Sequence, residues 1–413
     1  MKWKYYPLKK VAPSSTSKLK FNPNDQVWHL NLDQIESHTG NILEKKRSNA
    51  SSAGNSTYVF DSNNVLYSKL RPYLNKVVCP DGPGIATTEL VPLCPQPEIL
   101  DRKFLTYFLR SNRFLNFASA MVAGAKMPRV VMTKFWEYEI PLPTLTEQRR
   151  IVEILDQADR LRKLRAEADK KAVRILPALF IKMFGDPATN PMGWETTTFN
   201  EIIKETRNGL YKPAKFYGSG IGILKMYNIL NGDLNLSRID LINVEDKEYK
   251  TYCLLPGDIL INRVNTPELV GKSAVITEDV GKAVFESKNI RLRVNRKKTT
   301  PEYITHYLNS HFGQGSLKGG VKHAIGMATI NNTDLRNTFL VLPPLDLQVK
   351  WSLMVQNVRN NKKDFCSSAN KIEELFKNLL HRAFTGDLTA SWRQANMKEL
   401  LQEMELQAKA LNN

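Results

Sequence analysis

The chain has 413 residues, of which 42% are hydrophobic, and it carries a formal net charge of +18 at pH 7. This length allows two or three domains with ordinary cores, and the basic balance favours a polyanionic partner, although many unrelated proteins are also basic. The four cysteines, at 79, 94, 253 and 366, lack the spacing of a zinc site or a disulfide framework. Because no signal peptide and no apolar run of about 18 residues is visible, we expect a cytoplasmic protein with reduced thiols.

Residues 1–143 are predicted to form a first globule of short strands and helices. Trp28 to Asp33 alternates as a strand does, and residues 44–57 are polar enough for a loop. Further strands are expected at 64–67 and 76–79, a helix at 100–120, and a loop at 123–129. The globule closes with Pro141-Leu-Pro143.

Residues 144–184 are predicted to form one central long helix that begins near Thr146. Its apolar residues follow the alternating three- and four-residue steps of a coiled coil: Ile151, Ile154, Ala158, Leu161, Ala168, Ala172, Ile175 and Leu179. A helix of about 40 residues spans about 60 Å, which is too long for the core of one small domain. We therefore expect a spacer, with Pro177 as a candidate for a kink near its end.

The same pattern recurs 200 residues later. Leu142-Pro143, Leu145 and Gln148 return as Leu342-Pro343, Leu345 and Gln348, and the segment 104–111 matches 303–310. Leu66–Arg71 also resembles Leu260–Asn265. The chain therefore contains a duplicated half, not a short structural repeat.

The duplication divides the chain into five predicted parts. They are a first globule at 1–143, a central long helix at 144–184, a second globule at 185–343, a second long helix at 344–386 and a C-terminal tail helix at 387–413. Strands in the second globule are expected at 221–224, 258–262, 273–277 and 290–294. The tail helix has an apolar stripe, Met397, Leu400, Leu401 and Met404, which we expect to pack on the first globule.

These motifs resemble those of specificity subunits of type I restriction–modification enzymes, over essentially the whole chain. The most specific part runs from Pro141-Leu-Pro-Thr-Leu-Thr-Glu-Gln148 through the long helix to Asp186 and on to Asn190-Pro-Met-Gly-Trp194. Ala383–Thr389 with Trp392-Arg393 is similar to the family's closing motif, and Ser68–Lys76 and Pro256–Leu260 to its target recognition domains. The second copy departs from the pattern at Leu347, where the first has Glu147.

The resemblance implies an α+β fold with two pseudo-symmetric mixed α/β target recognition domains. Two long helices, pairing as an antiparallel coiled coil, would separate these domains. Each domain would read one half of a bipartite, asymmetric double-stranded DNA target. The coiled coil would set the half-site spacing and dock two methyltransferase (modification) subunits, with two ATP-dependent restriction subunits as further candidate partners. The chain itself would be non-catalytic and hold no cofactor, because S-adenosylmethionine, ATP and Mg²⁺ are expected on the partner subunits.

Candidate DNA contacts are basic and amide side chains in loops beside proline or glycine, where they can reach base edges or phosphates. In the first globule they are Lys69, Arg71, Lys76, Lys126 and Arg129, and in the second Arg263, Asn265, Lys272, Lys322 and His323. A given loop lysine is more often merely solvated, so the set is more secure than its members. Tyr211 and Tyr217, near Lys212 and Lys215, could stack on bases but are expected to be ordinary aromatics.

Two other functional classes remain as alternatives. The first is a self-contained methyltransferase–nuclease, against which the missing motifs argue. Phe216–Gly222 resembles a cofactor-binding glycine turn but lacks the preceding strand and following helix, and Glu248-Tyr-Lys250 and Glu286-Ser-Lys288 are short strings that occur by chance. The second is a structural coiled-coil adaptor with incidental charge, which predicts that deleting either globule leaves DNA affinity unchanged.

Overall fold

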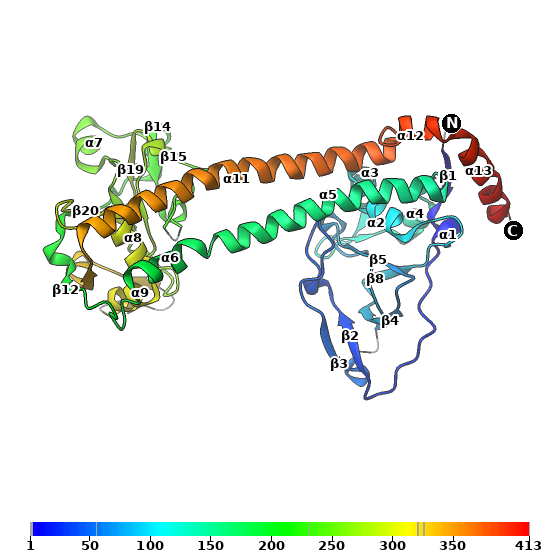
Figure 1. Ribbon diagram of the computed structural model, residues 1–413, viewed down its shortest axis with the longest axis horizontal. Helices are drawn as coiled ribbons and strands as arrows, with labels where there is room; N and C mark the ends of the chain where they lie inside the picture. The colour runs from blue at the N-terminus through cyan, green and yellow to red at the C-terminus, as the bar shows by residue number, and fades with distance from the viewer. Residues whose placement is uncertain (1–2, 55, 231, 320–321, 325–326, 413) are drawn as a thin grey trace. The chain divides into compact units, whose positions relative to one another are not determined.

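The computed structural model describes residues 3–412 except 55, 231, 320–321 and 325–326, without the side chains of 322–324, 362–366 and 412 (Figure 1). The chain divides into two compact units. Unit 1 consists of residues 1–165 and 368–413, and unit 2 of residues 166–367. Each unit therefore contains one globule together with a segment of each long helical region.

The globule of unit 1 is built from small sheets. Strand β1 (Lys4–Pro7) pairs antiparallel with β11 (Glu139–Leu142), immediately before the first long helix. A four-stranded sheet has the order β3-β2-β7-β4, and a three-stranded sheet has the order β6-β5-β8. Their bounds are β2 (Gln26–Leu30), β3 (Lys46–Asn49), β4 (Thr57–Phe60), β5 (Val65–Ser68), β6 (Val77–Val78), β7 (Gly84–Thr87) and β8 (Leu90–Leu93).

Helices cover the three-stranded sheet of unit 1. They are α1 (Leu8–Val11), α2 (Arg102–Arg110), α3 (Asn112–Ala120) and α4 (Met132–Glu137). The single helix predicted at 100–120 is wrong, because Ser111 adopts extended backbone, ends α2 and caps α3 with its hydroxyl, which accepts a hydrogen bond from the Phe114 N–H. Phe104 and Phe108 of α2 pack into the same core as Tyr67 of β5.

The first long helical region is two helices, α5 (Leu145–Ala172) and α6 (Ile175–Phe184), so the prediction of one continuous helix is wrong. The expected irregularity at Pro177 explains the break. Proline has no N–H to donate to the carbonyl four residues earlier, at Val173, and its ring crowds that carbonyl. In the second copy, α11 (Leu345–Thr385) runs unbroken for 41 residues.

In unit 1, α5 packs against the C-terminal part of α11. Ile151 and Leu155 share a core with Phe376 and Leu380, and the Arg162 Nε donates to Glu373 at 2.8 Å. The start of α5 meets α12 (Ala390–Ala395), which follows the end of α11, through hydrogen bonds described below. The two helices therefore run antiparallel in this unit, as expected.

The tail helix α13 (Met397–Asn412) packs on the first globule, which confirms that prediction. Leu400 and Leu411 are buried, and the Gln407 amide donates to the carbonyls of Ile99 and Pro143 at 2.9 and 3.2 Å. Leu401, predicted to belong to the apolar stripe, is exposed because it lies beside the face that carries Leu400, Gln407 and Leu411.

Unit 2 repeats the architecture of unit 1. Strand β12 (Glu195–Thr198) pairs with β23 (Phe339–Leu342), as β1 pairs with β11. Parallel pairing of β14 with β19 matches that of β2 with β7. The predicted strands of the second globule are confirmed as β14 (Tyr217–Leu224), β16 (Ile259–Asn262), β18 (Ser273–Val275) and β20 (Asn289–Val294).

The remaining elements of unit 2 complete its sheets and their helical cover. The sheet orders are β13-β20-β16-β18, β15-β14-β19 and β17-β22-β21. The bounds are β13 (Ile203–Asn208), β15 (Asp240–Ile242), β17 (Val264–Asn265), β19 (Ala283–Phe285), β21 (Lys322–Ala324), β22 (Met327–Thr329), α7 (Asp246–Tyr252), α8 (Pro301–Asn309), α9 (His311–Lys318) and α10 (Asn332–Asn337).

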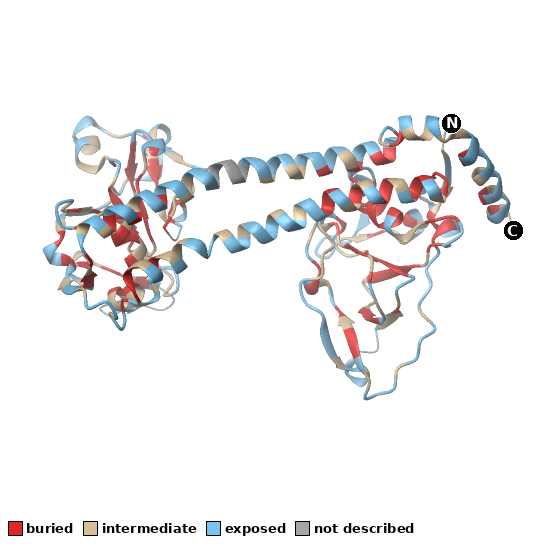
Figure 2. Ribbon diagram, viewed as in Figure 1, coloured by how far each residue is buried: buried red, intermediate tan, exposed pale blue. Residues whose placement is uncertain are grey.

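Aromatic side chains join the helical segments of unit 2 to its globule. Phe180 and Phe184 of α6 pack on Tyr303 of α8, with ring centroids 5.5 and 4.9 Å apart, and both also contact Trp351 of α11. In Figure 2 the buried residues of α11 in this unit lie in its first turns, where it meets the globule. No helix that the structure describes is long and apolar enough to cross a membrane.

Candidate nucleic-acid interface

In unit 1, two loops that carry predicted contact residues lie side by side. The segment Lys69–Asn75, termed the hook, follows β5, and β9 (Val122–Ala123) and β10 (Arg129–Val130) form a hairpin. The Arg71 N–H donates to the Pro128 carbonyl at 2.8 Å, and the Val130 N–H donates to the Lys69 carbonyl at 2.9 Å. These backbone hydrogen bonds fix the hook against the hairpin.

The hook is held in an unusual backbone conformation. Arg71 and Asn75 both have φ of 48°, in the left-handed region that residues other than glycine seldom adopt. Between them, Pro72–Leu74 forms a single 3₁₀ turn. The Asn75 amide donates to the Arg110 carbonyl at 3.0 Å, and the Leu74 carbonyl accepts from the His38 N–H at 2.9 Å. The surrounding structure therefore fixes this strained turn, which presents Tyr73 at its tip with 50% of its surface exposed.

The hairpin turn beside the hook is equally constrained. Gly124 has φ of +92°, and a Cβ on it would lie 3.2 Å from the Met127 carbonyl oxygen, so the turn requires glycine. Lys126 and Met127 follow it at the exposed end of the hairpin, and Met127 is 46% exposed. An exposed cationic residue and an exposed apolar residue are therefore adjacent at the end of this hairpin.

The five residues predicted in unit 1 are not equally available. Arg71 and Lys126 are exposed, and Lys69 is half-buried. The Lys76 ammonium donates to the Leu32 carbonyl at 2.6 Å, and burial lowers its pKa. Arg129 holds Glu89 through three hydrogen bonds of 2.8–3.1 Å, and this pairing lowers the pKa of that carboxyl. Lys76 and Arg129 therefore already have protein partners.

The residues predicted in unit 2 lie at the matching place, where β16 leads into β17. The Arg263 guanidinium donates to the carbonyls of Ile330 and Ser287, each at 3.4 Å. The Asn265 amide donates to Asn262 at 2.9 Å, and Lys272 is half-buried immediately before β18. The backbones of Lys322 and His323 form part of β21, and their side chains lie outside the described residues.

The repeat reveals an equivalence that the choice of charged candidates missed. Leu70 pairs with Arg129 in unit 1, and Val264 pairs with Thr329 in unit 2. Thr329 lies 200 positions after Arg129 in the sequence. The same register relates Met127 to Met327, which is 41% exposed. Tyr73, Met127 and Met327 were overlooked because only polar side chains were considered, although the 200-residue register relates the two methionines.

The aromatic residues weighed in unit 2 differ in exposure. Tyr211 is 80% exposed and Lys215 is also exposed. Tyr217 is half-buried, with the Lys225 ammonium 4.4 Å from its ring centroid, and Lys212 forms an ion pair with Glu248. Tyr211 and Lys215 are therefore the members of this group that remain accessible to a ligand.

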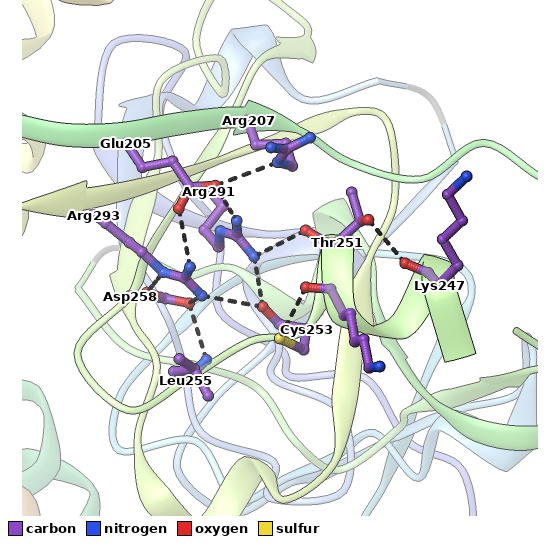
Figure 3. A network of polar contacts seen from close by, with 10 residues as sticks. Glu205, Arg207, Lys247, Thr251, Cys253, Leu255, Asp258, Arg291 and Arg293 are labelled. Atoms are coloured by element: carbon purple, nitrogen blue, oxygen red, sulfur yellow. Dashed lines mark hydrogen bonds and ion pairs between the residues drawn. The ribbon is translucent and has the colours of Figure 1, made fainter. Parts of the chain in front are cut away.

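Part of the basic charge of unit 2 is internal. Figure 3 shows Arg291 and Arg293 of β20 converging on Glu205 of β13, Asp258 and the carbonyl of Cys253. Arg291 is almost completely buried and donates to Glu205 and Cys253 at 2.6 Å each. The hydrogen bonds from Arg293 to Asp258 raise the pKa of that guanidinium. Both arginines stabilise the fold, so the net charge overstates the charge available to a polyanion.

The segments that resemble catalytic motifs have structural roles. The glycine run 218–222 lies within β14, where Gly220, with φ of +105°, allows a bulge against the Ile242 carbonyl. It is therefore no strand-to-helix turn. Glu248 belongs to the cap of α7, and the Glu286 carboxylate accepts a hydrogen bond from the Met226 N–H at 2.6 Å.

Comparisons with known proteins agree on one family. Residues 2–173 match the type I restriction modification DNA specificity domain. The type I restriction enzyme StySPI specificity subunit of Salmonella potsdam is 26% identical, and the match covers 73% of this chain and 69% of that protein. The EcoKI specificity subunit of Escherichia coli K12 is also 26% identical, over 71% of this chain and 67% of the relative.

Solved structures share the fold. A chain from a type I R-M system matches with a TM-score of 0.61 and 21% identity, over 94% of this chain and 98% of that one. The S subunit of a type I restriction-modification system from M. genitalium matches with a TM-score of 0.54 and 14% identity, over 92% and 96% of the two chains. The family model covers the first repeat, and the second repeat shares with it the parallel pair (β2–β7 and β14–β19) and the antiparallel pair that precedes each long helix (β1–β11 and β12–β23).

Proposed function

We propose that this chain, which belongs to the family of type I restriction–modification specificity subunits, uses each of its two globules to read a different half of a bipartite, asymmetric DNA target. The observation that carries the proposal is the duplicated architecture with different surface residues. Both units contain the parallel pair β2–β7 or β14–β19 and the same loop junction after β5 or β16. At that junction unit 1 has the exposed residues Arg71 and Tyr73, and unit 2 has the half-buried residues Arg263 and Asn265.

We also propose that the long helices set the gap between the half-sites and carry the partner subunits. Exposed apolar residues on these helices support a docking role: Leu161, Leu164 and Leu375 in unit 1, and Ile181, Leu353 and Met354 in unit 2. Leu161 is 50% exposed, although the coiled-coil pattern predicts it in the seam between the helices. Large apolar side chains left in water commonly mark protein interfaces. The partners would be two modification subunits and, where the system restricts DNA, two restriction subunits.

In this proposal the chemistry belongs to the partners. The modification subunits would bind S-adenosylmethionine and methylate adenine, and restriction subunits would use ATP and Mg²⁺. The role of this chain would be to bind DNA, discriminate between sequences and position the partners. The complex would act in the cytoplasm.

Deletion of either globule distinguishes this function from the adaptor alternative. The full complex and variants lacking residues 1–143 or 185–343 would be compared for binding to duplex DNA that contains the target. A specificity subunit requires both globules, so either deletion should abolish preference for the target over scrambled DNA. An adaptor would retain its DNA affinity in both deletions. Methyl transfer by the purified chain alone would instead support the alternative of a self-contained methyltransferase–nuclease.

A further inference from the structure

The tip of unit 1 combines exposed apolar and cationic side chains on a rigid frame. Tyr73 lies two residues beyond Arg71, and Met127 lies one residue before Pro128. Because the Arg71 N–H and the Pro128 carbonyl are 2.8 Å apart, both side chains belong to the same end of the unit. Arg71 and Lys126 are exposed beside them.

We propose that Tyr73 and Met127 form an apolar wedge that contacts the bases of the half-site read by unit 1, with Arg71 and Lys126 on the flanking phosphates. This inference rests on the proposed function. Apolar side chains contact thymine methyl groups or enter between base pairs, whereas cations neutralise phosphates. The wedge therefore assigns sequence discrimination to two residues that carry no charge.

Backbone conformation supports a recognition role for the hook. Arg71 and Asn75, two positions before and two positions after Tyr73, both have positive φ, and neither is glycine. A buried hydrogen bond from the Asn75 amide and a backbone hydrogen bond to the Leu74 carbonyl hold the turn, so Tyr73 is presented in a fixed position before a ligand arrives. A preorganised aromatic tip loses little conformational freedom on binding.

The second repeat supplies an independent observation. Met327, related to Met127 by the 200-residue register, is also exposed, and it lies in β22 against β17. An exposed methionine therefore recurs beside the loop junction in both units, although the sequences around it differ. Charge decides the occupant in favour of DNA over a protein surface, since the flanking Arg71 and Lys126 complement a polyanion.

The test measures binding of the assembled complex to its mapped target by fluorescence anisotropy, with either half-site scrambled in turn. Tyr73→Ala is expected to weaken target binding about tenfold, in the range of losing one base–aromatic contact. Scrambling the half-site that unit 1 reads should then weaken binding of the Tyr73→Ala variant little further. Scrambling the other half-site should weaken its binding as much as it weakens binding of the parent. Met127→Ala should act in the same direction, and Tyr73→Phe should retain target binding because it keeps the ring.

Two controls make the result decisive. Leu406→Ala, an exposed apolar residue on α13, should leave binding unchanged. The dependence of affinity on salt should be the same in Tyr73→Ala as in the parent, because tyrosine releases no counterions. The wedge would be overturned if both alanine variants kept the parent's preference for the target. It would also be overturned if they lost as much affinity for unrelated DNA as for the target. If the parent complex itself shows no half-site dependence, the proposed function fails instead.

Discussion

Glu147 joins three distant parts of unit 1. Its buried carboxylate accepts hydrogen bonds from the Trp3 indole at 3.0 Å, the Thr389 hydroxyl at 2.7 Å and the Arg393 Nε at 2.6 Å. This carboxylate therefore joins the beginning of the chain and the residues after α11 to the start of α5. Leu347 occupies the equivalent place in the second repeat and packs against an apolar core.

Replacing Glu147 by the residue of the second repeat tests this role. Glu147→Leu leaves the largely buried Arg393 guanidinium without its counter-charge. Breaking such a pair from one side is expected to lower the free energy of unfolding by about 3–5 kcal/mol. Urea unfolding of the whole chain would measure the loss. Glu153→Ala, on an exposed face of the same helix, should cost less than about 1 kcal/mol.

The double variant Glu147→Leu/Arg393→Met separates charge burial from packing. Because both charges are then removed, it should recover part of the stability lost in the single variant. A double variant as unstable as the single one would contradict the assignment of Glu147 and Arg393 as a mutually dependent pair.

His306 makes unit 2 sensitive to acid. Its Nδ1 lies 3.0 Å from the Glu302 carbonyl, so the neutral ring donates there, and the ring packs edge-on against Trp351. Burial, the largest cause, lowers its pKa from 6.5 to about 4. Between pH 4 and 6.5 the imidazole is therefore protonated in the unfolded chain and neutral in the folded unit. The associated stability is complete above pH 6.5 and is lost as the pH falls toward 4.

A pH series measures this dependence directly. Unfolding of unit 2 by urea should become easier between pH 6.5 and 4, by up to about 3 kcal/mol from this group. His306→Phe should flatten that part of the profile. His381→Phe, at an exposed position on α11, should retain it. An unchanged slope in His306→Phe would show that other groups cause the acid sensitivity.

At the scale of elements, sequence reasoning succeeded where local patterns decide structure. The strands of the second globule and the duplication follow from periodicity and internal matches. The break after α5 depends on a single residue, Pro177, and the division of 100–120 depends on the backbone of Ser111. Neither changes the hydrophobic pattern on which the prediction relied.

Removing the proline should join α5 and α6. Pro177→Ala restores an N–H that can donate to the Val173 carbonyl, and alanine is the strongest helix former. Amide hydrogen exchange at residues 173–178 is expected to slow, with a small rise in helical circular dichroism. Pro213→Ala, in an exposed loop, is the matched control. Unchanged exchange at 173–178 would mean that Pro177 does not cause the break.

The candidate DNA contacts could be predicted only in part. Loop position and charge led to Arg71 and Lys126, which are exposed. The same criteria led to Arg129, whose partner Glu89 lies 40 residues away in the sequence and is brought to it only by the fold. Such a long-range pair cannot be recognised from the residues next to Arg129 in the sequence. Tyr73 and Met127 carry no charge, so a criterion based on charge does not select them.

At the scale of the whole molecule, the charge predicts how binding depends on salt. Affinity for DNA should fall steeply with salt through counterion release, and Arg71→Ala and Lys126→Ala should each reduce the log–log slope by about one. The ammonium of Lys9, on α1, pairs with Glu137 of α4, so Lys9→Ala should leave the slope unchanged. A salt-independent affinity of the parent complex would contradict the electrostatic part of the account.

A methylome tests the central claim most directly. This chain would be expressed with its modification subunit in an unmethylated host, and modified bases would be mapped by direct sequencing. Two related but different globules predict one split, asymmetric motif with a fixed gap, and replacing either globule should change only one half of it. Methylation at a continuous palindrome would contradict reading by two globules.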